Sequence, residues 1–350
     1  MSKIVQDYTL TEVIGSGQYG KVWKARHNET GESFAIKSIS IQQISAVEKL
    51  KEFVSSEIAA LELISNPYIV KYYGKLQTPN NIYLIFEFCR GGTLEDLLKA
   101  QGSLDESKAM YFFGQILSAF TELHRLHIMH RDLKPSNILL DGGVAKLADF
   151  GFCTRMRGDF EMTKSIVGSP IYMAPELLQG NYYCTKADIW SLGVVLYEML
   201  HGRCPYEENS IPALLDKIKA FPEVSFRPDL SLETKSLLQG MLTFNPSTRI
   251  KWSDLLARSS GLASSSPPKQ PTSYPLPMTS LANSYVPYTS PAPQSYLPAK
   301  DLIPTRETDL PGYAAVPQMR YQSSSTLPYS TSPYSGETSI QQHVVKPSPV

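Results

Sequence analysis

The sequence predicts an α+β fold that is rich in β-strands near its start and mainly helical after them, followed by a disordered tail. Three observations predict this fold and the tail that follows it. A glycine-rich loop joins two β-like segments between residues 8 and 26. Apolar residues recur at helical spacing in long segments after residue 45. The composition changes sharply near residue 258, which divides the 350 residues into a folded part and a tail.

Charge and cysteine content exclude several classes of protein. Lysine and arginine together number 33, as do aspartate and glutamate, so no net field attracts the chain to nucleic acid or to an anionic membrane. The four cysteines form no CxxC pair and lack zinc-ligand spacing, which favours free thiols. No secretory leader is present, and no apolar run approaches the roughly 20 residues that span a bilayer. We therefore expect a cytoplasmic or nuclear protein.

The tail, residues 259–350, has a composition of its own. It holds 16 of the 26 prolines and eight tyrosines among many serines and threonines, but only nine charged residues. Such a segment buries too little apolar area to offset the entropy lost on ordering it. We predict that residues 259–350 are disordered.

The first candidate site is the run GSGQYGKV at residues 15–22, which fits the pattern G-x-G-x-x-G-x-V. Glycine loops also bind dinucleotides, but there the loop leads into a helix. Here residues 22–26 are rich in β-forming side chains, and residues 8–14 are also β-like. A strand, a glycine loop and a second strand predict a flap that covers phosphates.

Lys37 and Glu57 are predicted to form an ion pair. Lys37 ends a strand-like run and by itself would be a solvated lysine. The capping-box pattern of residues 45–48 (Ser45 to Glu48) opens a helix after it. The apolar stripe of this helix consists of Val47, Leu50, Val54, Ile58 and Leu61. Glu57 borders this apolar stripe and therefore needs a cation nearby. The alternative is that Glu57 is a charge on the helix surface that pairs with a local lysine. The pair would aim the ammonium at phosphates, and rotation of the helix would break it.

Residues 82–89 predict a buried strand that runs into Arg90-Gly91-Gly92. An extended backbone at its end could offer amide and carbonyl groups to a flat heterocycle. Phe86 would guard the pocket behind this strand, and plain core packing of Phe86 fits the sequence equally well.

A long helix leads into the principal candidate site. The pattern from Ser103 to Glu106 is another capping box. The apolar residues that follow share one helix face: Met110, Phe113, Leu117, Phe120 and Leu123. The run HRDLKPSNIL then occupies residues 130–139, and Asp149-Phe150-Gly151 begins twelve residues after Asn137.

Four polar residues of this region have the types and spacing needed for phosphoryl transfer on magnesium. Asp132 would orient the attacking hydroxyl, and Lys134 would neutralise the γ-phosphate. Asn137 and Asp149 would supply the oxygen ligands that Mg²⁺ prefers. We interpret His130 as a packed structural residue.

Taken together, these motifs resemble the eukaryotic protein kinase family over about residues 8–258. The matching runs are GSGQYGKV, AIK, HRDLKPSN, DFG, APE at 174–176 and DIWSLG at 188–193. Lys134 and the run at 168–173 resemble serine/threonine kinases, and this resemblance implies that the hydroxyl of Ser169 contacts the catalytic aspartate and lysine. The resemblance implies the two-lobed protein kinase fold, with the N-lobe at 8–90 and the C-lobe at 91–258, and a serine/threonine protein kinase that uses ATP and Mg²⁺. Every essential motif is intact, which argues against a pseudokinase.

The resemblance also assigns site residues. Asp132, Lys134, Lys37 and Glu57 would be catalytic, and Asn137 and Asp149 would hold Mg²⁺. The residues implied for nucleotide binding are Ile14, Gly15, Gly17, Gly20, Val22, Ala35, Lys37, Phe86, Glu87, Cys89, Leu139 and Asp149. Arg249 lies where the family's arginine pairs with the APE glutamate, Glu176. Asp188 would brace the catalytic loop, with a local cap from Thr185 to Asp188 as the structural alternative, although both could hold.

The expected substrate is a protein serine or threonine. Thr93 and Ser136 stand where kinases that select an upstream arginine carry acids, and Met173 stands where proline-directed kinases carry arginine. An apolar pocket for the residue after the phosphosite would be lined by Ile166, Pro170 and Met173. Phe152 resembles the bulky residue that accompanies a preference for serine over threonine.

Arg131, beside Asp132, resembles the arginine of kinases that are switched on by phosphorylation of the activation segment. An upstream kinase or autophosphorylation in trans would add the phosphate, and Arg155 could help to bind it. Ser165 is the first expected acceptor and Thr163 the second. A constitutively ordered loop is the alternative.

The runs ADFGFCTR, GSPIYMAPELL and FEFCRGGTLEDLL most resemble the Unc-51-like, autophagy-initiating group. In the tail, Tyr313–Val316 follows Glu307 and Asp309, a pattern that fits a peptide adding a strand to a ubiquitin-like autophagy protein. The alternative function is a nucleotide-binding scaffold of the kinase fold whose tail recruits partners and whose catalysis is incidental. A small-molecule kinase is disfavoured, because residues 166–176 resemble a peptide-docking segment.

Overall fold

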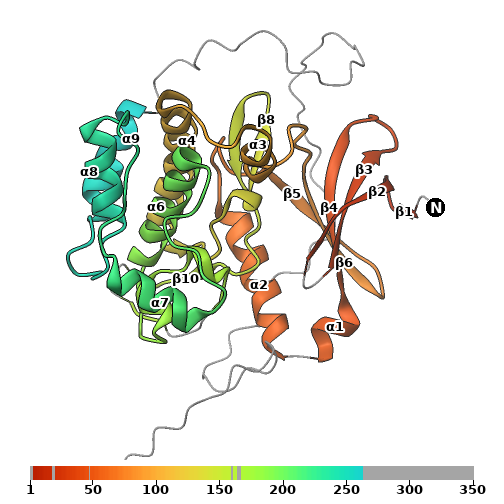
Figure 1. Cartoon of the computed structure of the whole chain (residues 1–350). Coiled ribbons are helices and arrows are strands. Elements are labelled where there is room, and N and C mark those ends of the chain that lie inside the picture. The colour runs from red at the N-terminus through yellow and green to blue at the C-terminus, as the bar shows by residue number, and fades with distance from the viewer. Residues whose placement is uncertain (1–2, 18–19, 47, 159–160, 164–166, 263–350) are drawn as a thin grey trace, which may run out of the picture. The chain divides into compact units, whose positions relative to one another are not determined.

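The computed structural model describes residues 3–17, 20–46, 48–158, 161–163 and 167–262. Contacts divide the chain into two units, 1–286 and 287–350, and every described residue belongs to the first. Within that unit the predicted α+β fold is confirmed, because a β-rich lobe precedes a mainly helical lobe (Figure 1). The last helix ends at Leu262, so it passes the predicted domain boundary at 258. The rest of the tail lies outside the described residues.

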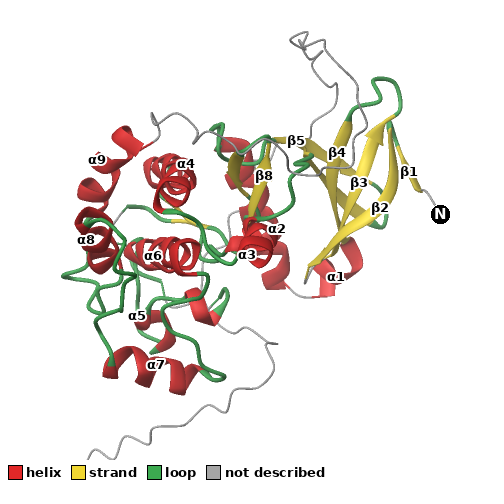
Figure 2. Cartoon of the chain, turned by 45° about the horizontal axis from the view of Figure 1, so that its top comes forward, coloured by secondary structure: helices red, strands yellow, loops and turns green. Residues whose placement is uncertain are grey.

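The N-terminal lobe is built on an antiparallel sheet, whose strands are yellow in Figure 2. The strand order of this sheet is β1-β2-β3-β4-β6-β5. Its strands are β1 (Lys3–Val5), β2 (Tyr8–Gly17), β3 (Gly20–His27), β4 (Ser33–Ser40), β5 (Tyr72–Gln77) and β6 (Asn81–Glu87). Strand β1 lies before the predicted start of the domain at residue 8. It is part of the fold, because Val5 is buried in the core of the sheet.

The two faces of this sheet carry different side chains, because successive side chains of a strand point to opposite faces. Phe34 and Ile36 of β4 are buried on one face, in a cluster with residues of β3 and β6. The other face carries Lys37, which pairs with Val22 of β3. Ala35 lies on this second face as well and pairs with Phe86 of β6. The second face therefore gathers the residues predicted to meet a nucleotide.

The predicted helix of this lobe is present, but its start differs from the prediction. Helix α1 (Ile41–Ala46) precedes α2 (Glu48–Leu63), and Ser45 lies inside α1. The predicted capping box from Ser45 to Glu48 is therefore wrong, because the chain is already helical at Ser45. Val54 and Leu61 are buried as the stripe predicts, whereas Val47 and the side chain of Leu50 lie outside the described residues.

The C-terminal lobe has α6 at its centre, in contact with α4 and α8. Its helices are α3 (Leu94–Gln101), α4 (Glu106–Arg125), α5 (Pro175–Leu178), α6 (Lys186–His201), α7 (Ile211–Ala220), α8 (Leu232–Met241) and α9 (Trp252–Leu262). Its short strands are β7 (Ile128–Met129), β8 (Ile138–Asp141), β9 (Val144–Leu147) and β10 (Thr154–Arg155). Thirteen of the sixteen residues of α6 are buried, so this helix lies in the core of the lobe.

Helix α4 begins two residues later than its capping pattern predicts. Its N-cap is Asp105, whose carboxylate accepts from the Lys108 amide at 2.8 Å, so the predicted Ser103 cap is wrong. The apolar face is confirmed, since Phe113, Leu117 and Phe120 are fully buried.

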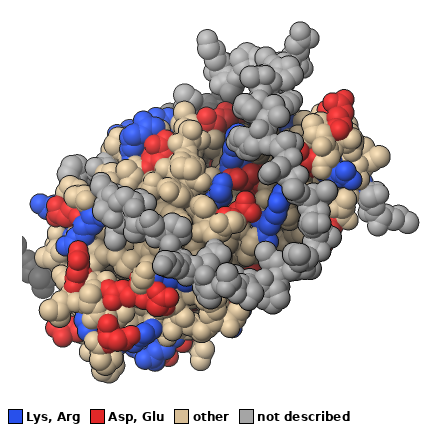
Figure 3. All heavy atoms as spheres, turned by 90° about the horizontal axis from the view of Figure 1, so that it is seen from above, with Lys and Arg blue, Asp and Glu red and all other residues tan. Residues whose placement is uncertain are grey.

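The surface agrees with the balanced charge of the sequence. Acidic and basic side chains are interspersed over the face shown in Figure 3. In the described part of the chain, no helix combines the length and the apolar character needed to cross a membrane.

Candidate active site

Lys37 is held by two acids from different parts of the fold. Its Nζ lies 2.6 Å from Oε1 of Glu57 on α2 and 3.5 Å from Oδ1 of Asp149. The Glu57 side chain is only 3% exposed, the Lys37 side chain 16% and the Asp149 side chain 48%. The predicted ion pair of Lys37 and Glu57 is therefore present, and its ammonium also faces a half-exposed carboxylate.

The three groups shift one another's ionisation. Burial disfavours the charged form of Lys37, but Glu57 and Asp149 outweigh burial and raise the pKa of Lys37 above its ordinary value. Burial also opposes ionisation of Asp149, but Lys37 and the Gly151 amide hold the pKa of Asp149 below its ordinary range. The ammonium and the exposed carboxylate are thus both charged at neutral pH.

Asn137 and Asp149 lie at the same end of the β8–β9 hairpin. Asn137 immediately precedes β8, and Asp149 follows β9 by two residues. Ile138 pairs with Leu147, and the Ala148 amide donates to the Asn137 carbonyl at 2.8 Å. One hairpin therefore positions both predicted magnesium ligands.

The donor set of this hairpin end fits Mg²⁺. The Asn137 Nδ2 group donates to the Asp132 carbonyl at 2.8 Å, which leaves the amide oxygen as an acceptor. Asp149 uses Oδ1 for Lys37 and Gly151, and the described residues place no donor on its Oδ2. They also contain no cluster of three His, Cys, Asp or Glu residues suited to a metal. An amide and one carboxylate completed by phosphate oxygens are typical of magnesium rather than of zinc.

Asp132 is fixed from several sides. Its Oδ1 accepts from the amide and the hydroxyl of Ser169, at 2.8 and 2.9 Å. Its Oδ2 lies 2.9 Å from Lys134 Nζ, which also donates to Ser169 Oγ at 2.8 Å. Asp132 and Lys134 thus meet as predicted, and Ser169 joins them from the 167–173 segment.

Asp188 on α6 holds the backbone of the catalytic loop. Its carboxylate oxygens accept from the amides of His130 and Arg131 at 2.9 and 3.0 Å. Burial raises the pKa of Asp188, and these two amides stabilise its charged form. Thr185 forms no side-chain cap, so the local capping interpretation is wrong. The Asp188 bonds help to hold Arg131 at φ +68°, in the left-handed region.

His130 is fully buried, as its structural interpretation predicts. Its ring lies 5.3 Å from the Phe150 ring in an edge-on arrangement, and its Nε2 is 3.1 Å from the Ala148 carbonyl oxygen. His130 therefore packs the catalytic loop against the DFG segment.

The glycine-rich flap is present as the strands β2 and β3, with residues 18 and 19 outside the described residues. Gly15 pairs with Val22, and Gly17 pairs with Gly20. Gly20 is needed for packing, because a Cβ there would lie 1.7 Å from the Ser38 carbonyl oxygen. Ile14 is 45% exposed at the rim of the sheet.

The segment 87–92, named the hinge here, links the two lobes. Its second half is joined to β8, because the Gly91 amide donates to Leu140 at 2.8 Å and the Leu140 amide to Gly92 at 2.9 Å. Leu139 of β8 bridges to Thr93, immediately after the hinge. Burial raises the pKa of Cys89 to about 12, so this thiol is protonated at neutral pH.

The activation segment is described only in part. Thr163 exchanges two backbone hydrogen bonds of 2.9 Å with Tyr183. Ser165 and Ile166 lie outside the described residues. Arg131 donates through Nε to the Phe152 carbonyl at 2.6 Å, and Arg155 is exposed on β10.

The end of this segment is anchored by a buried ion pair. Arg249 donates to both oxygens of Glu176, each at 2.8 Å, as the resemblance implies. Gly168 has φ +106°, and a Cβ there would lie 2.3 Å from the Arg131 carbonyl oxygen. Only glycine fits where the segment crosses the catalytic loop.

The site combines a lysine held by a helix glutamate with an aspartate and an asparagine at one hairpin end, and a glycine flap completes it. This combination defines a class of protein, the two-lobed phosphotransferases. The protein kinase domain model matches residues 8–259. The chain therefore belongs to the protein kinase family.

Curated relatives agree with this assignment. The chain is 36% identical over 261 residues to serine/threonine-protein kinase ATG1b of Arabidopsis thaliana, covering 72% of this chain and 36% of that protein. It is 38% identical over 251 residues to serine/threonine protein kinase OSK3 of Oryza sativa subsp. japonica, covering 71% and 49%. It is 38% identical over 249 residues to CBL-interacting serine/threonine-protein kinase 24 of Arabidopsis thaliana, covering 71% and 55%. The matches thus span between 36% and 55% of these relatives.

The predicted resemblance to serine/threonine protein kinases is confirmed, and the similarity to ATG1b and ATG1c agrees with the predicted likeness to the Unc-51-like group.

Sequence reasoning missed two interactions of the site. The Thr93 hydroxyl caps α3 and Asp96 bonds back to Thr93, a capping box that its T-x-x-D spacing could have indicated. Lys146 pairs with Glu87 at 2.7 Å, a contact across 59 positions that no local signal reveals.

Proposed function

We propose that this chain is an active serine/threonine protein kinase that transfers the γ-phosphoryl group of ATP to hydroxyls of protein substrates with Mg²⁺. The arrangement of Asp132 carries the proposal. Its carboxylate is fixed by Ser169 on one oxygen and Lys134 on the other. A carboxylate fixed in this way is ready to accept the proton of an incoming hydroxyl.

The remaining site residues have complementary tasks. Magnesium-bound ATP supplies the transferable phosphoryl group, and the cation neutralises its charge. Asn137 and Asp149 would hold the cation, and Lys37 would bind the α- and β-phosphates while Glu57 orients it. The second face of the sheet and the hinge would enclose the base.

The preferred acceptor is a serine flanked by apolar residues. Pro170 is exposed beside Ser169, which supports an apolar contact with the residue after the phosphosite, whereas Met173 is buried. Thr93 caps α3 and provides no charge for an upstream arginine. Phe152 supports serine over threonine by family resemblance.

Phosphorylation of Ser165, or of Thr163, would activate the enzyme by binding near Arg131. Arg131 lies at the base of the activation segment, bonded to Phe152. If Ser165→Ala and Thr163→Ala both retain full activity, activation by phosphorylation is wrong.

Membership of the Unc-51-like group, a cytoplasmic or nuclear location and recognition of Tyr313–Val316 by a ubiquitin-like protein complete the proposal. The similarity to ATG1b supports the group. The tail peptide lies outside the described residues, so its support is the sequence pattern alone.

The test is phosphorylation of a serine and threonine peptide array by the purified chain with Mg-ATP. We expect phosphoserine on sites with apolar flanks, and loss of transfer on chelation of magnesium. Asp132→Asn should remove transfer, whereas Asp216→Asn on the exposed face of α7 should not. Arrays dominated by an upstream arginine or a downstream proline would contradict the predicted preference. A cellular role that survives Asp132→Asn would favour the scaffold alternative.

A further inference from the structure

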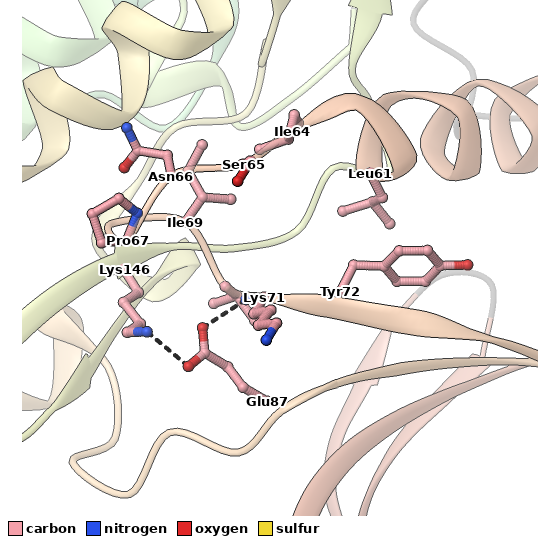
Figure 4. A pocket seen from close by; sticks show the side chains of 11 residues that line it. Leu61, Ile64, Ser65, Asn66, Pro67, Ile69, Lys71, Tyr72, Glu87 and Lys146 are labelled. Atoms are coloured by element: carbon pink, nitrogen blue, oxygen red, sulfur yellow. Dashed lines mark hydrogen bonds and ion pairs between the residues drawn. The ribbon is translucent and has the colours of Figure 1, made fainter. Parts of the chain in front are cut away.

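The carboxylate of Glu87 joins three segments at the start of the hinge. Its Oε2 accepts from Lys146 Nζ at 2.7 Å, and its Oε1 accepts from the Lys71 amide at 2.6 Å (Figure 4). The Glu87 amide also donates to the Lys71 carbonyl at 3.0 Å. Residue 71 leads into β5 of the N-lobe and Lys146 lies in β9 of the C-lobe, so the junction links both lobes to the hinge.

Strand β9 is itself anchored to the N-lobe. The Val70 amide donates to the Leu147 carbonyl at 2.9 Å, and the Leu147 amide donates to the Tyr68 carbonyl at 2.8 Å. Lys146 is therefore held in a fixed strand and reaches Glu87 from it. The same hairpin carries Asn137 and Asp149 at its end.

The two halves of the hinge are attached to this hairpin by different means. Residues 90–92 use backbone bonds and the Asp141 carboxylate, which accepts from the Arg90 amide at 3.2 Å. The first half is attached through the side chains of Glu87 and Lys146. A substitution of Lys146 therefore removes the side-chain attachment of Glu87 to the hairpin, while the backbone bond of Glu87 to Lys71 and the bonds of residues 90–92 to β8 remain.

Glu87 and Lys146 border a cavity of about 500 Å³ (Figure 4). The rest of its wall comes from the end of α2 and from residues 64–72. Both side chains of the pair are less than 20% exposed, so their attraction is stronger than that of a surface pair. Because the space beside Lys146 is already open, truncating its side chain widens an existing cavity and creates no new hole in the core.

We propose that Lys146 is a positioning residue for the nucleotide. Through Glu87 it holds the hinge backbone at a fixed distance from the hairpin end where Asn137 and Asp149 lie. A nucleotide must contact the hinge and the hairpin end together, so a fixed spacing prepares both contacts before binding. In this role Lys146 would act through Glu87 and would contact neither the base nor the phosphates. The inference rests on the proposed function, because the hinge is taken as the base-binding segment.

The experiment compares Lys146→Met and Lys146→Arg with Lys75→Met, a matched control. Lys75 on β5 forms an exposed ion pair with Glu62 on α2, at 3.6 Å. Steady-state kinetics with varied ATP, the dissociation constant of a fluorescent ATP analogue and the melting temperature are measured for each full-length protein.

We expect Lys146→Met to raise both the KM for ATP and the dissociation constant about five- to tenfold, with kcat within about twofold of the parent. Lys146→Arg should restore most of the affinity, and Lys75→Met should change neither constant. Glu87→Gln should weaken binding to a similar degree, and adding Lys146→Met to it should cost little more.

Two results would overturn the inference. One is a fall in melting temperature and kcat without a change in affinity, which marks a purely structural ion pair. The other is additive losses in the double variant. If the parent binds the analogue but transfers no phosphate, while Lys146→Met still weakens binding, the kinase proposal fails and the positioning role stands.

Discussion

Replacing Arg249 with methionine should destabilise the helical lobe far more than removal of a surface arginine. Arg249 is 1% exposed, and its guanidinium group binds both oxygens of Glu176. It also donates to three backbone carbonyls, those of Lys186, Thr243 and Phe244. Methionine fills similar space but leaves a buried carboxylate and these carbonyls without their donor.

The size of the loss follows from this contact set. Breaking one half of a buried ion pair costs about 3–5 kcal/mol. In a domain of about 250 residues, each kcal/mol lowers the melting temperature by about 2–4 °C. We therefore expect the melting temperature to fall by about 6–20 °C.

Calorimetry of the purified chain measures this shift, with Arg125→Met as the matched control. Arg125 is 64% exposed and pairs with Glu122 on the surface of α4, so its loss should leave the melting temperature nearly unchanged. A double substitution, Glu176→Leu with Arg249→Met, removes both charges and should recover part of the stability. Equal melting temperatures for Arg249→Met and Arg125→Met would refute the reasoning.

Three further predictions concern catalysis and pH. Ser169→Ala should lower kcat about 10- to 100-fold in a peptide assay, whereas Ser169→Thr keeps the hydroxyl between Asp132 and Lys134 and should retain most activity. Glu57→Gln should lower kcat/KM for ATP about 10- to 100-fold, because a neutral amide orients Lys37 poorly; an unchanged value would contradict the role of the pair. Burial lowers the pKa of His201 below its ordinary 6.5, and the Arg227 amide donates to its Nε2. Its stabilising contribution is therefore complete above that value and is lost as pH falls toward the folded pKa, so His201→Gln should flatten the decline of melting temperature between about pH 7.5 and 5.5.

The parts of the fold that the sequence predicted are those set by local periodicity. The strand-loop-strand around Gly15 and the buried face of α4 needed only spacing and side-chain type. The capping boxes at Ser45 and Ser103 failed, because the entry of the chain into a helix depends on tertiary contacts. At α4, the Leu104 amide is already bonded to the Met199 carbonyl, and the Glu106 carboxylate accepts from the Ser231 amide.

The candidate site shows the same division. Asp132 and Asn137 share one loop, so their spacing indicated a common site. Ser169 emerged only as a neighbour implied by the family, and its two bonds to Asp132 required the folded chain. The contact of Glu87 with Lys146 had no signal in the sequence, because it joins strands of two different sheets across 59 positions.

The position of Asp188 has a consequence for how this protein loses activity. The side chain that holds the catalytic loop comes from α6, a long and largely buried helix, so the geometry of the reactive groups depends on the packing at the centre of the lobe. Thermal inactivation should therefore coincide with cooperative melting of the large lobe. Core substitutions far from any ligand, at the contacts of α6 with α4 or α8, should therefore lower the temperature of inactivation and the melting temperature together.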